Sequence, residues 1–231
     1  MYPHMTKKEV AKRYLCFIIG VLINSFAIAF ITKAALGTSP ISSIPYVLSL
    51  EFTPSLGLFS FIFNMVYIFM QMILLRKDFE KIQLLQIVVN IVFSAFIDVS
   101  MNLLSFLNPQ NLPEQLLLLL IGCIILGFGI ALEVLPGVLF VPGEGVVRAI
   151  ATVSHREFGN VKVCFDVTLM VTALILSFIF FGHLNGLGAG TIISACIVGF
   201  IEKFFAHRLG FVEKLLVDDK SFQGGKQARG I

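Results

Sequence analysis

Long apolar stretches alternate with short polar segments along the whole chain. Six of these stretches are about 20 residues long, which is the length that an α-helix needs to cross ~30 Å of hydrocarbon. Backbone polar groups cannot stay unpaired in lipid, and no alternating pattern typical of a β-barrel is present, so each stretch is predicted to be a transmembrane helix. The predicted spans are Tyr14–Ala34, Gly57–Leu75, Ile82–Phe106, Glu114–Val134, Val161–Phe181 and Gly186–Ala206.

Two of the connections, Ala35–Leu56 and Leu135–Asn160, do not fit this simple pattern. They are too apolar for solvent loops, and Gly and Pro interrupt them too often for a continuous spanning helix. Each is expected to turn at a proline and continue as a short helix that lies in the interface or re-enters the membrane. The first would lie on the outer side and the second on the inner side.

The two halves of the chain are related by a shift of 102 positions. The shift aligns identical residues, notably Gly20 with Gly122, Pro40 with Pro142, Gly57 with Gly159 and Phe63 with Phe165, and it puts Asn64 opposite Asp166. After a small change of register, Phe96, Ile97 and Asp98 align with Phe200, Ile201 and Glu202.

Each half has three spans, an odd number, so the halves must point in opposite directions. The predicted fold class is an all-α membrane protein, a 3+3 inverted repeat with one broken element in each half. The halves cover residues 14–106 and 114–206 of a single domain, 1–208, followed by a cytoplasmic tail, 209–231.

Composition and charge agree with a membrane protein and indicate its sidedness. The chain is 57% hydrophobic and 13% charged, whereas soluble domains carry roughly 25% charged residues. On the six-span model, every Lys and Arg except Lys33 falls at one face, so both termini are predicted to be cytoplasmic. The basic residues are not arranged as a nucleic-acid-binding surface, and no nucleic-acid partner is expected.

The sequence lacks the usual signatures of enzymes and metal sites. Cys16, Cys123, Cys164 and Cys196 each stand alone in an apolar run, which is typical of packing residues. HExxH and GxSxG motifs are absent, and the glycine-rich stretch 186–190 lacks the Lys-Ser/Thr of a phosphate-binding loop. We therefore expect no catalytic residues, no metal and no cofactor, and rank an intramembrane enzyme last.

Several motifs resemble the YczE/YyaS/YitT family of bacterial membrane proteins. They are the stretches Phe140–Ile150, Gly159–Asp166 and Gly188–Ile193 in the second half, and Lys33–Pro40 and Gln83–Met101 in the first half. The resemblance covers roughly residues 10–210. It implies a multi-pass protein of the bacterial cytoplasmic (inner) membrane, and it brings neither a mechanism nor site residues.

Ionisable residues inside a bilayer are costly, so those in the predicted spans are candidates for function. Asp98 is the deepest carboxylate, Glu133 lies near the inner end of the fourth span, and Asp166 lies just over one turn into the fifth. Asp98 and Asp166 could carry a proton or cation, or could be hydrogen-bond acceptors that never titrate. Asn64 could line a polar path or hold helices together.

The broken elements hold the remaining candidates. Pro142, Gly143 and Gly145 form a turn whose free N–H groups would favour an anion, and Glu144 and Arg148 share one helix face. Arg148 could pair with Glu133, Asp166 or an anionic solute. The matched outer element offers hydroxyls and a proline instead: Ser39, Pro40 and Ser42.

These patterns favour a transporter or channel-like facilitator of a small solute or ion, with the broken elements flanking its path. Glu144 and Arg148 could equally form a structural lock. The alternative function is a membrane scaffold or regulatory subunit without a path, which predicts a dry interior. Expected partners are membrane lipids, a small solute or ion, and a second copy or another membrane protein.

Overall fold

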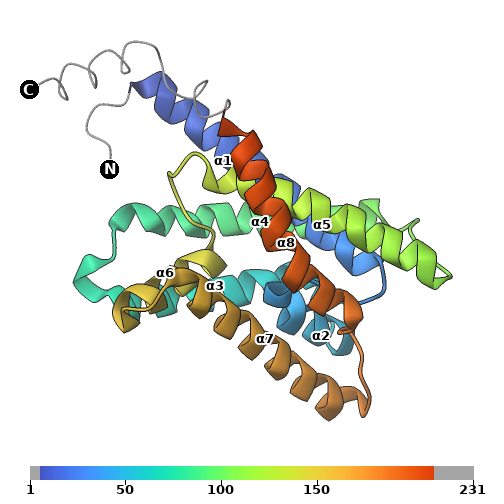
Figure 1. The fold of residues 1–231 in the computed structure, drawn as a ribbon. Coiled ribbons are helices and arrows are strands. Elements are labelled where there is room, and N and C mark those ends of the chain that lie inside the picture. The colour runs from blue at the N-terminus through green and yellow to red at the C-terminus, as the bar shows by residue number, and fades with distance from the viewer. Residues whose placement is uncertain (1–5, 211–231) are drawn as a thin grey trace, which may run out of the picture.

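A computed structural model describes residues 6–210 of the chain, and these residues contain helices but no strand. Six helices are long and apolar enough to cross a membrane: α1 (Lys7–Lys33), α3 (Leu56–Leu75), α4 (Gln86–Leu103), α5 (Leu112–Val134), α7 (Phe158–Phe181) and α8 (Ala189–Arg208) (Figure 1). The prediction of six spans is confirmed, and the chain is a multi-pass membrane protein. The predicted tail lies almost entirely outside the described residues.

Local hydrogen bonds explain where the helix ends differ from the predicted spans. α1 begins at Lys7 rather than Tyr14 because Thr6 and Glu9 form a capping box, in which the Thr6 backbone N–H donates to the Glu9 carboxylate over 2.7 Å. The third span begins with a 3₁₀ turn, η3 (Lys81–Leu85), and α4 ends at Leu103 rather than Phe106.

Both broken connections contain a short helix that starts at a proline, as predicted. The first contains a 3₁₀ turn, η1 (Pro40–Ser42), followed by α2 (Ser43–Glu51), and the second contains α6 (Pro142–Ser154). The residue before each proline is extended, and the missing proline N–H costs nothing at the first helical position. At 1.5 Å per residue, α2 and α6 are about 14 and 20 Å long, too short to cross the bilayer.

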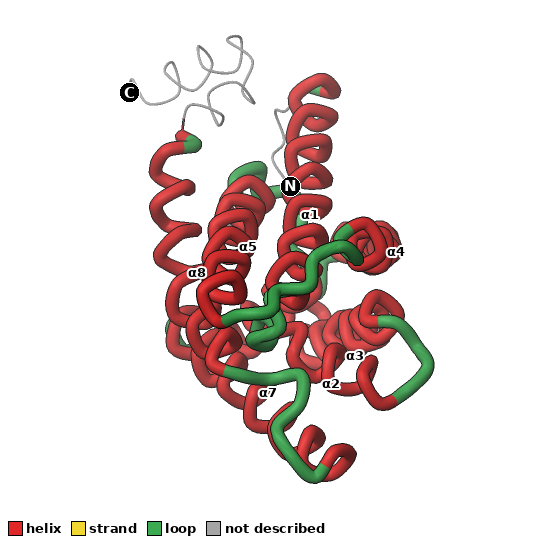
Figure 2. Tube along the Cα trace, turned by 90° about the vertical axis from the view of Figure 1, so that its right-hand side faces the viewer, coloured by secondary structure: helices red, strands yellow, loops and turns green. Residues whose placement is uncertain are grey.

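The helices form two groups that meet at α4. In one group α1 packs against α4 and α5, and α5 packs against α8; in the other, α3 packs against α2 and α6, and α7 packs against the same two short helices (Figures 1 and 2). α3 also packs along α4, whereas α7 and α8 are not packed along each other.

Glycines allow α1 and α5 to pack closely. Gly20 lies against the backbone of Glu133, and Gly122 lies against Ile31, so a methyl group at either glycine would overlap the other helix. Ala27, Ile31 and Cys123 are fully buried around this contact and form the main apolar core.

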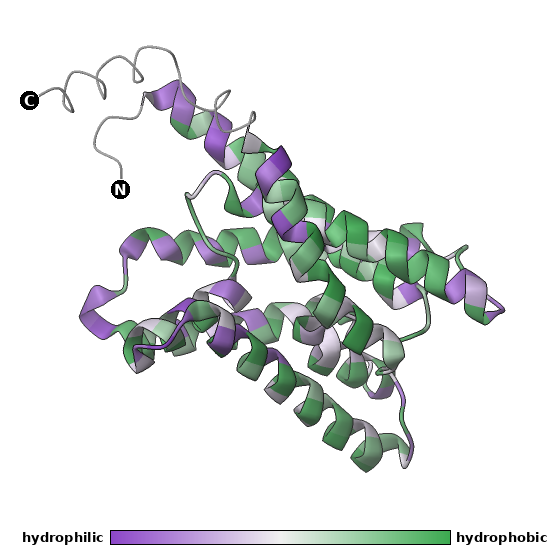
Figure 3. Ribbon diagram, in the orientation of Figure 1, coloured by the Kyte–Doolittle hydropathy of each residue, from purple (hydrophilic) through white to green (hydrophobic). Residues whose placement is uncertain are grey.

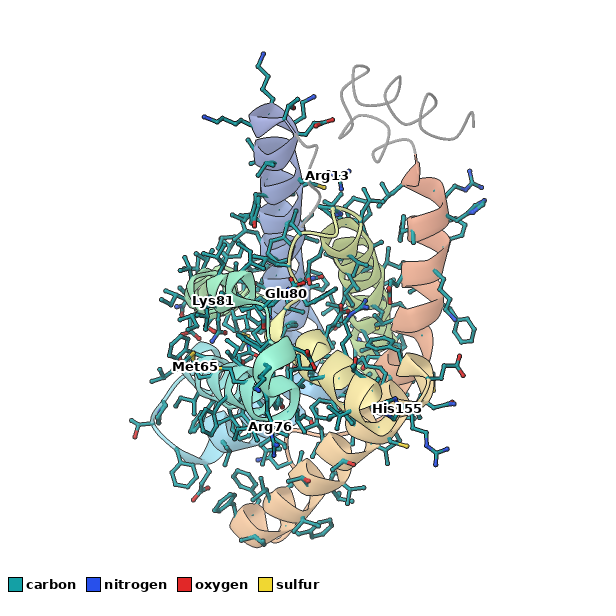
Figure 4. All side chains as sticks on the ribbon, turned by 90° about the vertical axis from the view of Figure 1, so that its left-hand side faces the viewer. Arg13, Met65, Arg76, Glu80, Lys81 and His155 are labelled. Atoms are coloured by element: carbon teal, nitrogen blue, oxygen red, sulfur yellow. The ribbon has the colours of Figure 1, made fainter. Side chains whose placement is uncertain are left out.

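Hydrophobic residues cover most of the long helices, and polar residues gather at their ends (Figure 3). The outward side chains of α7, such as Ile175 and Ile179, are more than half exposed, as expected for helices that face lipid. Arg76 and Lys81, in the connection between α3 and α4, lie at the same end of the molecule as His155 (Figures 1 and 4).

Candidate functional site

A cavity of about 410 Å³ lies between the two helix groups and brings both broken elements together. Ser39, Pro40 and Ser42 line it from η1, and α6 contributes Pro142, Gly143, Glu144 and Arg148. Asn64 of α3, Glu133 of α5 and Asp166 of α7 complete a set of ten predicted site residues that share this space. Because these residues lie far apart in the sequence, only the tertiary fold brings them together.

The two broken elements touch at their proline ends. The side chain of Ile41 lies so close to Gly143 that any side chain at this position would overlap it. Gly145, the next glycine of α6, does not line the cavity, but its lack of a side chain leaves room for the amide of Gln71. This amide donates to the carbonyl of Pro142 over 3.1 Å and so ties the start of α6 to α3.

Arg148 does not make the ion pairs that its sequence position suggested. Its guanidinium lies over two aromatic rings, 4.2 Å from the centre of Phe140 and 4.9 Å from that of Phe158. Within residues 6–210 no carboxylate lies within ion-pair distance of it, and its buried Nε has no hydrogen-bond partner. Cation–π contacts therefore hold Arg148 at the cavity wall.

The carboxylates of the cavity have different environments. Glu133 is only 2% exposed and accepts a hydrogen bond from the amide of Asn24 in α1. Asp166 pairs with Lys162, one turn earlier in α7, over 2.8 Å. Burial raises the pKa of Glu144 above its ordinary value, although Lys162 and Arg148 act in the opposite direction.

Several buried polar atoms around the cavity lack partners. Six buried side-chain atoms in the described part of the chain have no hydrogen-bond partner, and four belong to residues that line the cavity: Asn24 Oδ1, Ser60 Oγ, Tyr67 OH and Arg148 Nε. Buried polar groups in folded proteins are nearly always paired. A cluster of unpaired buried polar atoms is therefore typical of a site in which a bound molecule or water supplies the missing hydrogen bonds.

Asp98 lies outside this cavity, at the first turn of α3. Its carboxylate accepts hydrogen bonds from the Ser55 hydroxyl over 2.6 Å and from the Gly57 backbone N–H over 2.8 Å. The structure thus places the deepest predicted carboxylate at a helix N-terminus rather than in the cavity.

Several cavity residues were absent from the predicted site. The clearest are Asn24, Ser60, Tyr67, Lys162 and Glu202. The alignment of Glu202 with Asp98 in the repeat was one available signal. Ser60 and Tyr67 carried none, because nothing in the sequence of α3 tells which of its faces meets the cavity.

Comparisons with known proteins place the chain in a family. A model described as a family of unknown function, DUF6198, matches residues 11–207. The uncharacterized protein YyaS of Bacillus subtilis (strain 168) is 26% identical over 197 residues, which cover 84% of this chain and 92% of that protein. No solved structure matches the chain. The YyaS part of the expected resemblance is thus confirmed, and the chain belongs to the DUF6198 family.

Proposed function

We propose that this protein moves a small solute or ion across the cytoplasmic membrane, as a secondary transporter or a channel-like facilitator, with both termini in the cytoplasm. The observation that carries the proposal is the cavity itself. It is bounded by both proline-broken elements and lined by polar and ionisable side chains deep between apolar helices. Ionisable groups in a membrane protein usually face such a path.

The packing of α1 against α5 supports the inverted repeat on which this proposal depends. Gly20 contacts Glu133, and Gly122 contacts Ile31; the 102-position shift that relates the two glycines also relates Ile31 to Glu133. Ile41 and Gly143, which touch at the cavity, are related by the same shift. Reciprocal contacts of this kind are expected from two similar units around a pseudo-two-fold axis.

The two halves differ in how their last two helices pack against each other, and this difference supports alternating access. In the first half, α3 and α4 are joined by a hydrogen bond of 2.8 Å from Asn64 to Asn90. In the second half, α7 and α8 are not packed along each other, and both contribute residues to the cavity. We interpret this as a state that is closed between α3 and α4 and open between α7 and α8.

A scaffold or regulatory subunit is the competing function, and it would need no path. It predicts a dry interior in which polar groups are satisfied by their neighbours. The unpartnered polar atoms that line the cavity favour transport over this alternative.

The test is reconstitution in liposomes that contain a pH-sensitive dye, while candidate solutes are added outside. We expect Arg148→Glu to abolish the flux of the wild-type protein without loss of folding, because it reverses a charge in the cavity wall. Arg156→Glu is the matched control, since Arg156 is exposed beyond the end of α6 and does not line the cavity. Equal flux in wild-type and Arg148→Glu liposomes would contradict the proposal.

The sidedness has its own test. Single cysteines at Glu51, at the end of α2, and at Arg156, beyond the end of α6, are exposed and lie outside the cavity; in a background without native cysteines they should react with an impermeant thiol reagent from opposite compartments. Reaction of both from the same compartment alone would exclude opposite orientation of the two halves.

A further inference from the structure

The charges that line the cavity do not balance. Among residues 6–210, four carboxylates and three basic side chains line it: Glu133, Glu144, Asp166 and Glu202, against Arg148, Lys162 and Lys203. One negative charge is therefore left over. A single positive charge would make the cavity neutral.

Within residues 6–210, Glu133 makes no ion pair, and its side-chain hydrogen bond comes from the neutral amide of Asn24. Asp166 is paired with Lys162, and the charges of Arg148 and Lys162 act on Glu144. Glu202 is influenced by Lys162, Lys203 and Arg148. In the described part of the chain, Glu144 and Glu202, both acids, are the charged groups whose influence on Glu133 is evident.

The helices around Glu133 offer little else to neutralise it. α1 contributes the amide of Asn24, and its Arg13 is turned to the carbonyl of Pro136 over 2.7 Å. Because burial of a carboxylate without a counter-charge is strongly unfavourable, such a group takes up a proton or a cation. No group of three or more His, Cys, Asp or Glu side chains that could hold a metal ion occurs within residues 6–210.

The size and walls of the cavity indicate which cation fits. Its volume of about 410 Å³ is far larger than the ~30 Å³ that one water molecule occupies, so it exceeds the needs of a bare ion. Next to Glu133 on α5, Leu126 and Ile130 line it, and Phe63 and Tyr67 face it from α3. Apolar and aromatic walls suit an organic cation. The unpartnered hydroxyls of Ser60 and Tyr67, both at least 95% buried, point independently to a bound molecule or water.

We propose that Glu133 alternately holds a proton and the positive charge of an amphipathic organic cation, so that the cavity exchanges one for the other. This inference rests on the proposed transport function and names its substrate class. When the cation binds, the proton leaves the Glu133 carboxyl for water, and the total charge of the cavity stays the same.

Infrared spectroscopy of the detergent-solubilised protein tests the proton without knowledge of the natural solute. We expect the wild-type protein to show the C=O band of a protonated carboxyl near neutral pH, and Glu133→Gln to lack this band. Glu114→Gln is the control and should keep the band, because it alters an exposed carboxylate of the same helix. If Glu133→Gln fails to fold, Asn24→Ala serves instead, because it removes the amide partner and should shift the band. An identical band in wild type and these Glu133 or Asn24 variants would overturn the proposal.

Tetraethylammonium is the probe for the cation. Its addition should remove the band and release about one proton per protein. A band that persists at saturating tetraethylammonium would overturn the exchange. Parallel flux measurements in liposomes separate the two claims, because proton release without flux contradicts only the transport function, and flux without proton release contradicts only the role of Glu133.

A second inference comes from the starts of α3 and α7, which the repeat relates. Gly57 at the start of α3 is covered by Asp98 and Ser94 of α4. The matched Gly159 at the start of α7 has no atom within 4 Å of the place where a side chain would begin, and α7 has no side-chain cap. Glu202, which matches Asp98, lies on α8 at the edge of the cavity.

We infer that the two carboxylates are alternating latches. When α7 closes on α8, Glu202 caps the start of α7 at Gly159, as Asp98 now caps α3 at Gly57, and Asp98 then releases α3. This inference also rests on the proposed function, because it describes the other state of the transport cycle.

Cross-linking in membranes with a short bis-thiol reagent tests the latches, in a background without native cysteines. The pair Ser55→Cys and Asp98→Cys should cross-link in the state described here, since these side chains are 2.6 Å apart. The repeat-related pair Glu157→Cys and Glu202→Cys should also cross-link, and in the four-cysteine protein either cross-link should prevent the other. The inference would be overturned if the Glu157→Cys and Glu202→Cys pair never reacted, or if both cross-links formed in one molecule. If each pair cross-linked and excluded the other but the protein carried no flux, only the transport function would be contradicted.

Discussion

The carboxylate of Asp98 lies 2.8 Å from the backbone nitrogen of Gly57, at the first turn of α3. The N-terminus of a helix carries unpaired N–H groups and a partial positive charge, so it stabilises a carboxylate. The same carboxylate accepts from Ser55, which itself caps α3 by accepting from the N–H of Leu58 over 3.1 Å. Asp98 thus joins α4 to α3.

Asp98→Ala should therefore destabilise the protein. Removal of hydrogen bonds to a charged group costs about 1.5–3 kcal/mol, and the start of α3 would lose both of its hydrogen bonds to Asp98 of α4. The midpoint of thermal unfolding in detergent measures the effect. Asp78→Ala, at an exposed position after α3, is the control and should leave the midpoint unchanged.

The contact between α1 and α5 should tolerate no added volume. Gly20→Ala places a methyl group against the backbone of Glu133, and Gly122→Ala places one against the buried side chain of Ile31. We expect a loss of about 1–3 kcal/mol for each, which is typical of overpacking. Gly199→Ala in α8, where no atom lies within 4 Å, should be neutral in the same unfolding assay.

The contacts of Arg148 with two aromatic rings should favour a guanidinium over an ammonium group. Arg148→Lys keeps the charge but replaces the guanidinium near Phe140 and Phe158, and we expect a loss of about 1 kcal/mol in stability. Arg208→Lys, where the guanidinium lies 5.5 Å from the ring of Phe204 near the end of α8, is the matched control. Equal losses of stability in the two variants would show that the aromatic contacts of Arg148 stabilise the protein no more than those of Arg208.

Glu144 should make stability depend on pH in a particular direction. Because burial raises its pKa in the folded protein above the ordinary value of 4.5, the folded state favours the protonated carboxyl. The stabilisation from the protonated Glu144 carboxyl is complete below pH 4.5 and is lost as pH rises through the raised pKa of the folded protein. The unfolding midpoint of Glu144→Gln relative to wild type should therefore increase as pH rises above 4.5, and a constant difference would contradict this assignment.

Much of the fold could be predicted from local sequence. The six spans follow from runs of apolar residues, and the short helices follow from Pro40 and Pro142, since a proline favours the first turn of a helix and terminates what precedes it. The predicted ends of the helices were less accurate. The start of α1 depended on the capping box of Thr6 and Glu9, which lies outside the apolar run.

The candidate site, too, could be predicted only in part from local sequence. The sequence alone determined that the chain crosses the membrane as helices, that two connections are broken by proline, and that a few ionisable residues lie within apolar segments. Only the tertiary structure decided that Asp98 caps α3, that Arg148 contacts two aromatic rings, and that Glu133 is buried beside the amide of Asn24. The physical reason is that apolar length and proline act within one segment, whereas the partner of a buried charge depends on how distant helices pack and rotate against one another.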